Sequence, residues 1–232
     1  QTAFLASILL LSSFEVHRAA VACRVDMVQV AFIVISLCLL FRWDEKGCRG
    51  VPWLAVLLMG CATLTKGPVG SIFPCACIGV YQLRGRSFWK AFFSLAGIGL
   101  LSFVPYLAWV YVAYRQGGQP FLDLVLEENT GRFMGKMSYE SHENPIWYNF
   151  LTLIWGWIPW TLVLVISLFG LKWKNMRCLP EGETLLLRLK KGWTAFRNQS
   201  PVQLFTWLVI LIIFVFYCIP KSKRSVYLLP IY

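Results

Sequence analysis

The sequence predicts an all-α, polytopic transmembrane helical bundle that is truncated at both ends. Of its 232 residues, 58% are hydrophobic and 14% are charged, whereas soluble domains have about 25% charged residues. The apolar residues gather in runs near the roughly 17–25 residues that a membrane-spanning helix needs. The chain begins at Gln1 inside one apolar run and stops at Tyr232 inside another, so we expect a fragment of a longer membrane protein.

The expected helices follow these apolar runs in order along the chain. They are 1–14, 25–42, 51–65, 67–83, 91–114, 147–171, 203–219 and one that begins at Ser225. Polar connections lie between them, at 15–24, 42–50, 84–90, 115–146, 172–202 and 220–225. No internal repeat divides the chain, so we treat 1–232 as part of one transmembrane domain.

The net charge of +11 has a simple explanation in a membrane protein. Lys and Arg collect in cytoplasmic connections, so the charge does not require nucleic acid, and we expect no such partner. The connections 42–50, 84–90 and 172–202 are the basic ones, and helix parity puts all three on one side. We therefore expect 172–202 to be a cytoplasmic loop and 115–146 to lie on the outer side.

The same parity collects the polar residues of chemical interest on the outer face. Its connections and helix ends contain both cations and carboxylates, together with a histidine. The candidates on this face are Arg24, Asp26, Lys66, Arg132, His142, Lys221 and Lys223. A shared face at the membrane boundary suits a site for an amphiphilic ligand.

Lys66 stands between two apolar runs, in the sequence TLTKGPVG. An unpaired lysine at membrane depth is costly, so it either extends to the lipid headgroups or binds an anion. Gly67 gives a permissive backbone, and Pro68 suits the first turn of a helix whose free N–H groups favour anions. The anion reading predicts a phosphate-binding lysine.

Asp26 opens the next apolar run, where two readings are available. It could be an interfacial carboxylate at a helix N-terminus that pairs with Arg24. It could also activate an acceptor or hold a substrate cation at the water–lipid boundary. Lys221 and Lys223 leave a similar choice, because they are either tolerated outer charges or ligands of a lipid phosphate.

Five segments in order resemble those of a known family: CRVDMVQVAFIVISLCL, GCATLTKGPVGSIFP, ENTGRFMGKMSYESHENPIWYN, GWIPW and PKSKRSVYLLP. They are similar to the bacterial phospholipid-carrier-dependent glycosyltransferases of the GT-C superfamily, of the aminoarabinose-transferase and protein-O-mannosyltransferase type. The resemblance covers most of 15–232. Asn149 departs from it, since the family has a second aromatic residue there.

The resemblance implies a function. Such enzymes take a sugar from a polyprenyl-phosphate carrier on the periplasmic face of the bacterial inner membrane and transfer it to lipid A, another envelope glycolipid or a protein. The family's usual catalytic acid lies in a first periplasmic loop that this chain lacks. Asp26 matches the family's aspartate at the start of a helix, and we expect it to be the second catalytic acid or a helper.

The resemblance also assigns binding residues and a loop. The family's motifs match Lys66, Arg132, Tyr148, Lys221 and Lys223, which we expect to contact the phosphate or the sugar. We add Arg24 to these binding residues because it lies on the same outer face. A divalent metal is possible, with His142 as the candidate ligand, and 115–146 becomes a periplasmic loop that could close over the site.

Two other classes compete with a transferase. A transporter or flippase for an anionic lipid would also place cations near a membrane surface, although transporters often show inverted repeats and midplane charges. A structural membrane subunit would give Lys66 and Asp26 no special role. The sugar, the acceptor and the stereochemistry are not determined by the sequence.

Overall fold

The structure, a computed structural model, describes residues 2–131, 134, 144–176 and 199–232. Within these ranges the regular elements are all helices. They are α1 (Thr2–Ser12), α2 (Phe14–Val21), α3 (Val25–Glu45), α4 (Trp53–Lys66), α5 (Val69–Gln82), α6 (Phe88–Leu126), the π-helix η1 (Glu127–Gly131), α8 (Trp147–Gly156), α9 (Trp160–Met176), α11 (Pro201–Cys218) and the 3₁₀ helix η2 (Ser225–Ile231). The all-α prediction is confirmed.

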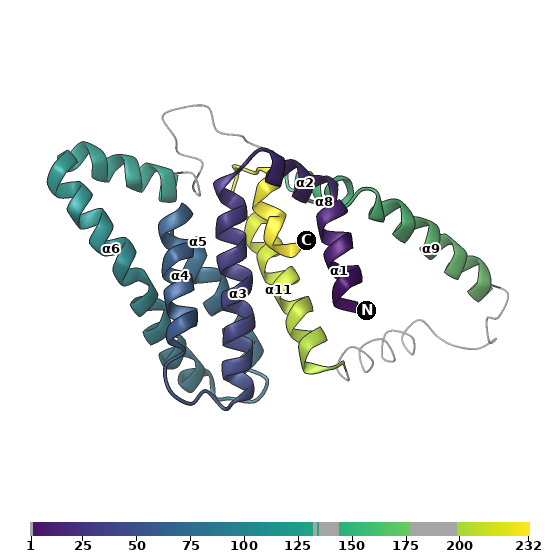
Figure 1. Cartoon of the computed structure of the whole chain (residues 1–232), viewed down its shortest axis with the longest axis horizontal. Helices are drawn as coiled ribbons and strands as arrows, with labels where there is room; N and C mark the ends of the chain where they lie inside the picture. The colour runs from purple at the N-terminus through teal and green to yellow at the C-terminus, as the bar shows by residue number, and fades with distance from the viewer. Residues whose placement is uncertain (1, 132–133, 135–143, 177–198) are drawn as a thin grey trace.

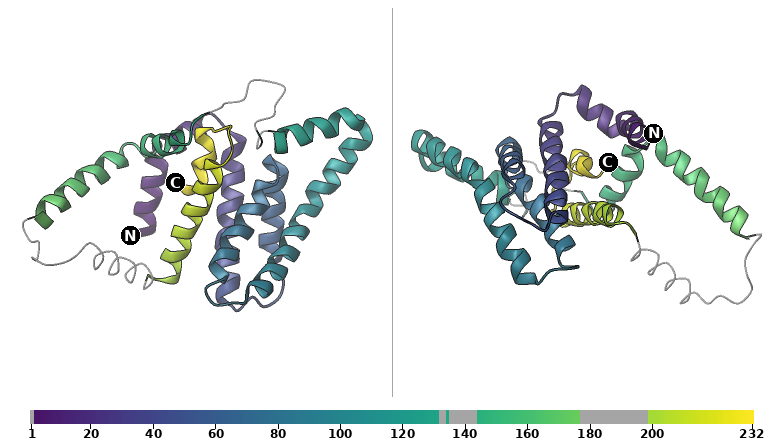
Figure 2. Two further views of the ribbon diagram at one scale, coloured as in Figure 1. Left: turned by 180° about the vertical axis from the view of Figure 1, so that it is seen from behind. Right: turned by 60° about the horizontal axis from the view of Figure 1, so that its bottom comes forward.

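The centre of the molecule is a bundle of α3, α4, α5, α6 and α11 (Figures 1 and 2). Helix α5 contacts α3, α4, α6 and α11, so it forms the middle of the packing. Large apolar side chains fill the space between the helices, among them Ile33, Leu40, Met59, Phe73, Ile78 and Ile213. Their burial against each other fixes the relative positions of the helix ends.

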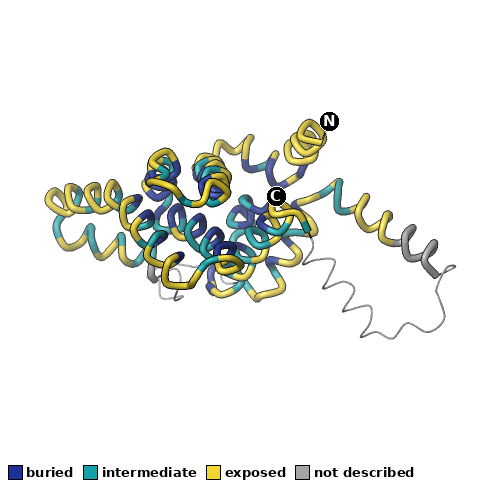
Figure 3. Tube along the Cα trace, turned by 90° about the horizontal axis from the view of Figure 1, so that it is seen from below, coloured by how far each residue is buried: buried dark blue, intermediate teal, exposed yellow. Residues whose placement is uncertain are grey.

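The outward faces of the helices are exposed, as Figure 3 shows for the view from below. Many of the exposed residues are large hydrophobic ones. In the described ranges, the helices long and apolar enough to cross a membrane are α3, α6 and α11. Two bent pairs, α1 with α2 and α8 with α9, raise the count from three to as many as five if each pair is one span. Exposed apolar surface of this extent needs lipid around it, which agrees with a polytopic membrane bundle.

A buried polar junction joins α4, α5 and α6 one turn below the end of α4. The Thr63 and Ser71 hydroxyls lie 2.6 Å apart, and the Ser102 hydroxyl donates to Ser71 at 2.8 Å. All three side chains are buried. Small hydroxyl residues permit close helix approach in membranes and add interhelical hydrogen bonds. The junction therefore holds the end of α4, and Lys66 with it, in a defined place.

Polar contacts at the opposite end of the bundle test the prediction, made from helix parity, that the basic connections lie on one side. The Gln82 amide donates to the Asp44 carboxylate at 2.9 Å, and the Arg86 guanidinium lies 3.7 Å from the same carboxylate. The connections 42–50 and 84–90 therefore share one end, and helix α11 begins at that end too (Figure 1). The prediction that the connections 42–50 and 84–90 lie at the same end of the bundle is confirmed. The side of the membrane that this end faces stays a prediction.

The expectation of one straight helix over 147–171 is wrong. The structure breaks the segment between α8 and α9, and the two helices meet at 99°. Pro159 stands at the break and has no backbone N–H to continue the hydrogen-bond ladder of α8. Helix α8 consequently turns away from the direction of α9.

Two expected connections are helical over much of their length. Helix α2 covers most of 15–24, and residues 115–131 continue α6 and form η1. Gly118 interrupts α6 with φ +63°, a conformation that glycine adopts easily, and Pro120 follows. Figure 1 shows the last part of α6 turned back toward the ends of α4 and α5. The segment from Ser225 forms the short η2 instead of an α-helix.

Candidate functional site

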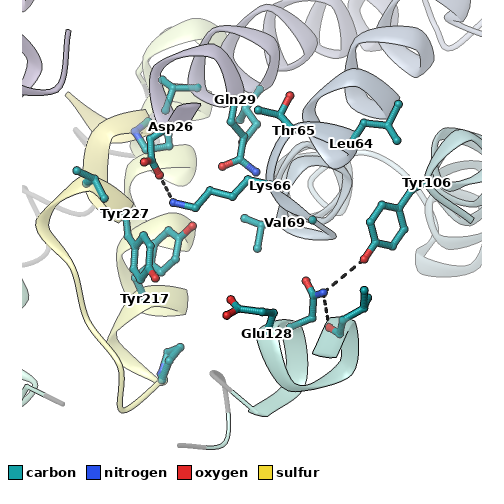
Figure 4. Close-up of a pocket in the computed structure, with 18 of the residues that line it drawn as sticks. Asp26, Gln29, Leu64, Thr65, Lys66, Val69, Tyr106, Glu128, Tyr217 and Tyr227 are labelled. Carbon is teal, nitrogen blue, oxygen red and sulfur yellow. Dashed lines mark hydrogen bonds and ion pairs between the residues drawn. The ribbon is translucent and has the colours of Figure 1, made fainter. Parts of the chain in front are cut away.

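A cavity of about 490 Å³ opens where the ends of α3, α4 and α11 meet α6, η1 and η2 (Figure 4). Most of its wall is apolar or aromatic. The polar and charged side chains in the wall include Asp26, Gln29, Lys66, Tyr106, Glu128, Asn129, Tyr217 and Tyr227. The parity argument expected Asp26 and Lys66 on one face, and the structure places both in this one wall.

Lys66 and Asp26 form an ion pair across the boundary of α3 and α4 (Figure 4). The side chains are 29% and 11% exposed, respectively, so both remain open to the cavity. Arg24 lies exposed at the N-cap of α3. Arg24 was the partner expected from the sequence, whereas the ion pair in the structure joins Asp26 to Lys66, forty residues further along the chain.

Two tyrosines form the wall beside Lys66. The Lys66 Nζ atom lies 5.1 Å from the centroid of the Tyr227 ring. Tyr227 stacks on Tyr217 with ring centroids 5.2 Å apart and planes at 20°. An ammonium over an aromatic face is attracted to the ring quadrupole. Lys66 is thus held from two sides, by the Asp26 carboxylate and by an aromatic ring.

The opposite wall comes from η1, which is fixed by Asn129. The Asn129 amide donates to the Val125 carbonyl at 2.8 Å and lies 3.4 Å from the Tyr106 hydroxyl. Its Oδ1 atom would be 2.6 Å from a Cβ placed on Gly67, whose φ is +97°. The backbone after Lys66 therefore packs directly on η1, which also brings the Glu128 carboxylate to the cavity (Figure 4).

Gln29 lies one helical turn after Asp26 on α3 and also lines the cavity. The residue is 7% exposed. Its amide Nε2 is buried and has no hydrogen-bond partner among the residues that the structure describes. Buried polar groups are usually hydrogen-bonded, so this amide is an exception within the site.

A second ion pair supports the side of the site that carries Tyr227. Glu15, fully buried on α2, accepts two hydrogen bonds from Arg18, at 2.9 and 2.5 Å. The same guanidinium donates to the Ser225 hydroxyl at 2.7 Å. A bidentate pair of this kind is directional, so it fixes α2 against the first residue of η2.

The other predicted site residues lie away from the cavity wall or outside the described residues. Lys223 is 4% exposed, and its ammonium donates to the Pro220 carbonyl at 2.6 Å. Lys221 is exposed, and Tyr148 is half-buried on α8. The turn at 220–222 reaches the cavity through Pro220 and Ser222. Arg24, Lys221, Lys223 and Tyr148 are not in the wall that the structure describes.

Arg132 and His142 lie outside the described residues, so the structure does not test their predicted roles. Within the described ranges, no group of three or more His, Cys, Asp or Glu side chains could hold a metal ion. The possible metal at His142 therefore stays a prediction.

Several residues of the site were not predicted from the sequence. Gln29, Tyr217 and Tyr227 stand in apolar runs, where a single polar or aromatic residue gives little signal. Glu15 and Arg18 have the i, i+3 spacing of a helical ion pair. That spacing was a signal that could have identified α2 as a helix.

Asn149, the departure from the family pattern, has a structural role. It is 2% exposed, and its amide donates to the Tyr217 carbonyl at 2.8 Å. This hydrogen bond connects α8 to the end of α11. The substitution therefore supports the backbone that carries one of the two stacked tyrosines.

Comparison with known proteins gives relatives that extend well beyond this chain. An uncharacterised protein of Aquifex aeolicus is 25% identical over 233 residues, which is 100% of this chain and 40% of that protein. The undecaprenyl phosphate-alpha-4-amino-4-deoxy-L-arabinose arabinosyl transferase 2 of Proteus mirabilis is 26% identical over 235 residues, 99% of this chain and 38% of the transferase. The chain thus spans about two fifths of the length of these relatives. No protein-family profile matches it.

A solved structure matches the fold. The crystal structure of ArnT from Cupriavidus metallidurans bound to undecaprenyl phosphate superposes with a TM-score of 0.64 at 21% identity. The match covers 96% of this chain and 37% of that protein. The chain therefore shares the helical fold of the matching part of that protein.

Proposed function

We propose that this GT-C-like chain is part of an integral-membrane glycosyltransferase. It moves a sugar from a polyprenyl-phosphate carrier to an envelope acceptor, a lipid A-like glycolipid or a protein. We place the reaction on the periplasmic face of the bacterial inner membrane, at the end of the bundle that carries Lys66. The likeness to transferases that act on undecaprenyl-phosphate-linked aminoarabinose supports this class of donor.

The observation that carries the proposal is an ion pair in the wall of a largely apolar and aromatic cavity at one end of the bundle. Lys66 is in contact with Asp26 and still partly exposed to the cavity. Cleavage of a sugar–phosphate bond develops negative charge on the leaving phosphate. A fixed cation stabilises that charge best where water is largely excluded. Lys66 is placed to do so.

The apolar part of the same wall suits the lipid part of such a donor. Leu64, Val69, Trp109, Phe121 and Leu124 line the cavity beside the ion pair. They come from α4, α5 and α6, whose outer surfaces face the bilayer in this proposal. A ligand with a phosphate at one end and a prenyl chain at the other would match both parts of the wall.

Asp26 and the outlying residues have roles that extend this proposal. Asp26 acts on the acceptor hydroxyl as base or orienting group, alone or together with an acid from the rest of the protein. Arg132, Lys221 and Lys223 supply further positive charge to the phosphate, and Arg24 and Tyr148 contact the donor at its edge. A divalent metal at His142 belongs to the same set of proposals.

The test is donor turnover by the full-length protein that contains this chain. Lys66→Ala should lower release of the polyprenyl phosphate from its sugar by about 10²–10³-fold, the usual effect of removing a group that stabilises transition-state charge. Lys46→Ala, in the connection at the opposite end of the bundle, is the matched control and should retain turnover. Unchanged turnover in the Lys66 variant would refute the phosphate role.

The rival transporter function gives a different result in the same preparation. A flippase in vesicles would move the intact lipid across the bilayer without cleaving it. A transferase releases polyprenyl phosphate only when an acceptor is supplied. Movement of intact donor without sugar transfer would overturn the proposed reaction.

A further inference from the structure

We propose that the Gln29 carboxamide donates a hydrogen bond to a phosphate oxygen of the ligand, beside Lys66. This inference rests on the proposed function, because it names a second contact to the phosphate of the same donor. Neither the sequence motifs nor the comparisons assign Gln29 a role.

The position of Gln29 follows from its spacing on α3. Residues three apart on a helix lie on the same face, so Gln29 and Asp26 point to the same side of α3 and both reach the cavity. Gln29 and Lys66 line the same cavity, and Figure 4 labels both. An oxygen in the cavity near the Lys66 ammonium would therefore also lie near the Gln29 amide.

The Gln29 amide is buried without a hydrogen-bond acceptor among the described residues, which favours an acceptor supplied by a ligand. Gln29 is 7% exposed, and its Nε2 atom has no partner in the described part of the chain. A buried donor without an acceptor destabilises the protein, because its hydrogen bonds to water are lost and not replaced. The nearby Asp26 Oδ1 atom already accepts from Lys66. A ligand oxygen would remove this deficit.

The chemical class of the ligand follows from the two neighbours together. Lys66 supplies a positive charge and Gln29 a neutral N–H donor, and both favour an acceptor that is an anion. Hydrogen bonds to an ionised acceptor are shorter and stronger than neutral ones. A phosphate has several oxygens and can accept from the ammonium and the amide at once, and this holds for a lipid phosphate and for inorganic phosphate.

The experiment measures binding and stability of the full-length protein with Gln29→Met, a substitution of similar length without hydrogen-bonding groups. The probe is polyprenyl phosphate without a sugar, and polyprenol without the phosphate is the control ligand. We expect Gln29→Met to bind polyprenyl phosphate about tenfold more weakly, the usual effect of a lost hydrogen bond to a charged group. Its affinity for polyprenol should not change.

Inorganic phosphate separates a headgroup contact from a contact that requires the lipid. If inorganic phosphate competes about tenfold more weakly for Gln29→Met than for the wild type, the Gln29 amide binds the phosphate group without help from the lipid. A loss confined to the lipid means that the prenyl chain must first place the phosphate. Both results support the contact, whereas unchanged affinity for polyprenyl phosphate, or an equal loss for polyprenol, overturns it.

The stability of the empty protein distinguishes this role from a structural one. Gln29→Met removes an unpaired buried amide, so the unfolding temperature without ligand should stay the same or rise. Gln82→Met is the matched control, because Gln82 is also buried but its amide bonds to Asp44 at 2.9 Å. That variant should be less stable and bind polyprenyl phosphate normally once folded. A lower unfolding temperature for Gln29→Met would overturn the inference.

The outcomes also separate this inference from the proposed function. If Lys66→Ala loses turnover while Gln29→Met binds and turns over normally, only the Gln29 contact fails. If Lys66→Ala keeps full turnover, the phosphate site itself fails. Gln29→Glu adds a second check, because a carboxylate there would repel the phosphate and should weaken binding more than Gln29→Met does.

Discussion

Gly67→Ala tests whether the backbone after Lys66 sets the shape of the site. Gly67 has φ +97° and ψ −168°, a region that is essentially restricted to glycine and costs other residues about 1–3 kcal/mol. The added Cβ would also lie 2.6 Å from the Oδ1 atom of Asn129. Asn129 must then move, and its hydrogen bond to the Val125 carbonyl, worth about 1 kcal/mol, is weakened.

These two effects should lower the free energy of unfolding by about 2–4 kcal/mol. They should also displace η1, which carries Glu128 to the cavity. A misplacement of about 1 Å in an active site can reduce activity about 10²-fold. The assay is thermal unfolding in detergent together with sugar transfer by the full-length protein. We expect a marked loss of transfer even at temperatures where the variant stays folded.

The matched control is Gly47→Ala at the opposite end of the bundle. Gly47 also has a positive φ, +78°, but a Cβ there meets nothing within 4 Å. It should therefore lose stability from backbone strain and keep its transfer rate. Gly67→Ala combined with Asn129→Ala removes the close contact, so the two changes should be less than additive. Wild-type stability and transfer in Gly67→Ala, or an equal loss of transfer in Gly47→Ala, would refute the reasoning.

Two native cysteines give further predictions. Cys23 is exposed at the bundle end that carries the site, so a membrane-impermeant maleimide should label it from the periplasmic side of intact cells; labelling only after lysis would reverse the proposed orientation. Burial, followed by the hydrogen bond and charge of Asp44, raises the pKa of the Cys48 thiol to about 11. Because the thiolate is the reactive form, the alkylation rate of Cys48 should be low at neutral pH and rise about tenfold per pH unit up to that pKa. The rate should be higher in Asp44→Asn, which lacks the carboxylate charge. A rate that levels off near pH 8–9 would contradict the raised pKa.

The arrangement of the helix ends could be predicted from the sequence because it depends on local patterns. Apolar runs define the helices, and their alternating direction determines which connections meet. That argument placed Asp26 and Lys66 on one face, and the ion pair between them agrees with it. The break at Pro159 and the continuation of α6 beyond Gly118 were missed, because apolar composition does not show where a helix changes direction.

The contacts within the site were less predictable, because they depend on distances between different helices. Arg24 is the nearest cation to Asp26 in sequence, but it lies exposed outside the cavity wall, and Lys66 is the partner. Tyr217 comes from α11, in a run of apolar residues that gives no functional signal. Its importance follows only from its stacking on Tyr227 beside Lys66. Such pairings require the packed structure.

The ion pair leads to a last prediction, for Asp26→Asn. In the empty protein the Lys66 ammonium is bound to the Asp26 carboxylate, so a phosphate that enters the cavity must share this cation with an anion. Asparagine keeps an oxygen that can accept from Lys66 but removes the negative charge. The Asp26 carboxylate and the ligand phosphate would repel each other near the one lysine. In a partly exposed site this repulsion is about 1–2 kcal/mol, between the values for surface and for semi-buried charge pairs.

Asp26→Asn should therefore bind polyprenyl phosphate about tenfold more tightly and transfer sugar much more slowly, because the carboxylate that serves the acceptor is gone. Binding to the purified full-length protein and transfer under saturating donor separate the two effects. The opposite signs are the informative feature, since general damage to the site would weaken both. Weaker binding with normal transfer would mean that Asp26 only positions Lys66 and takes no part in the reaction.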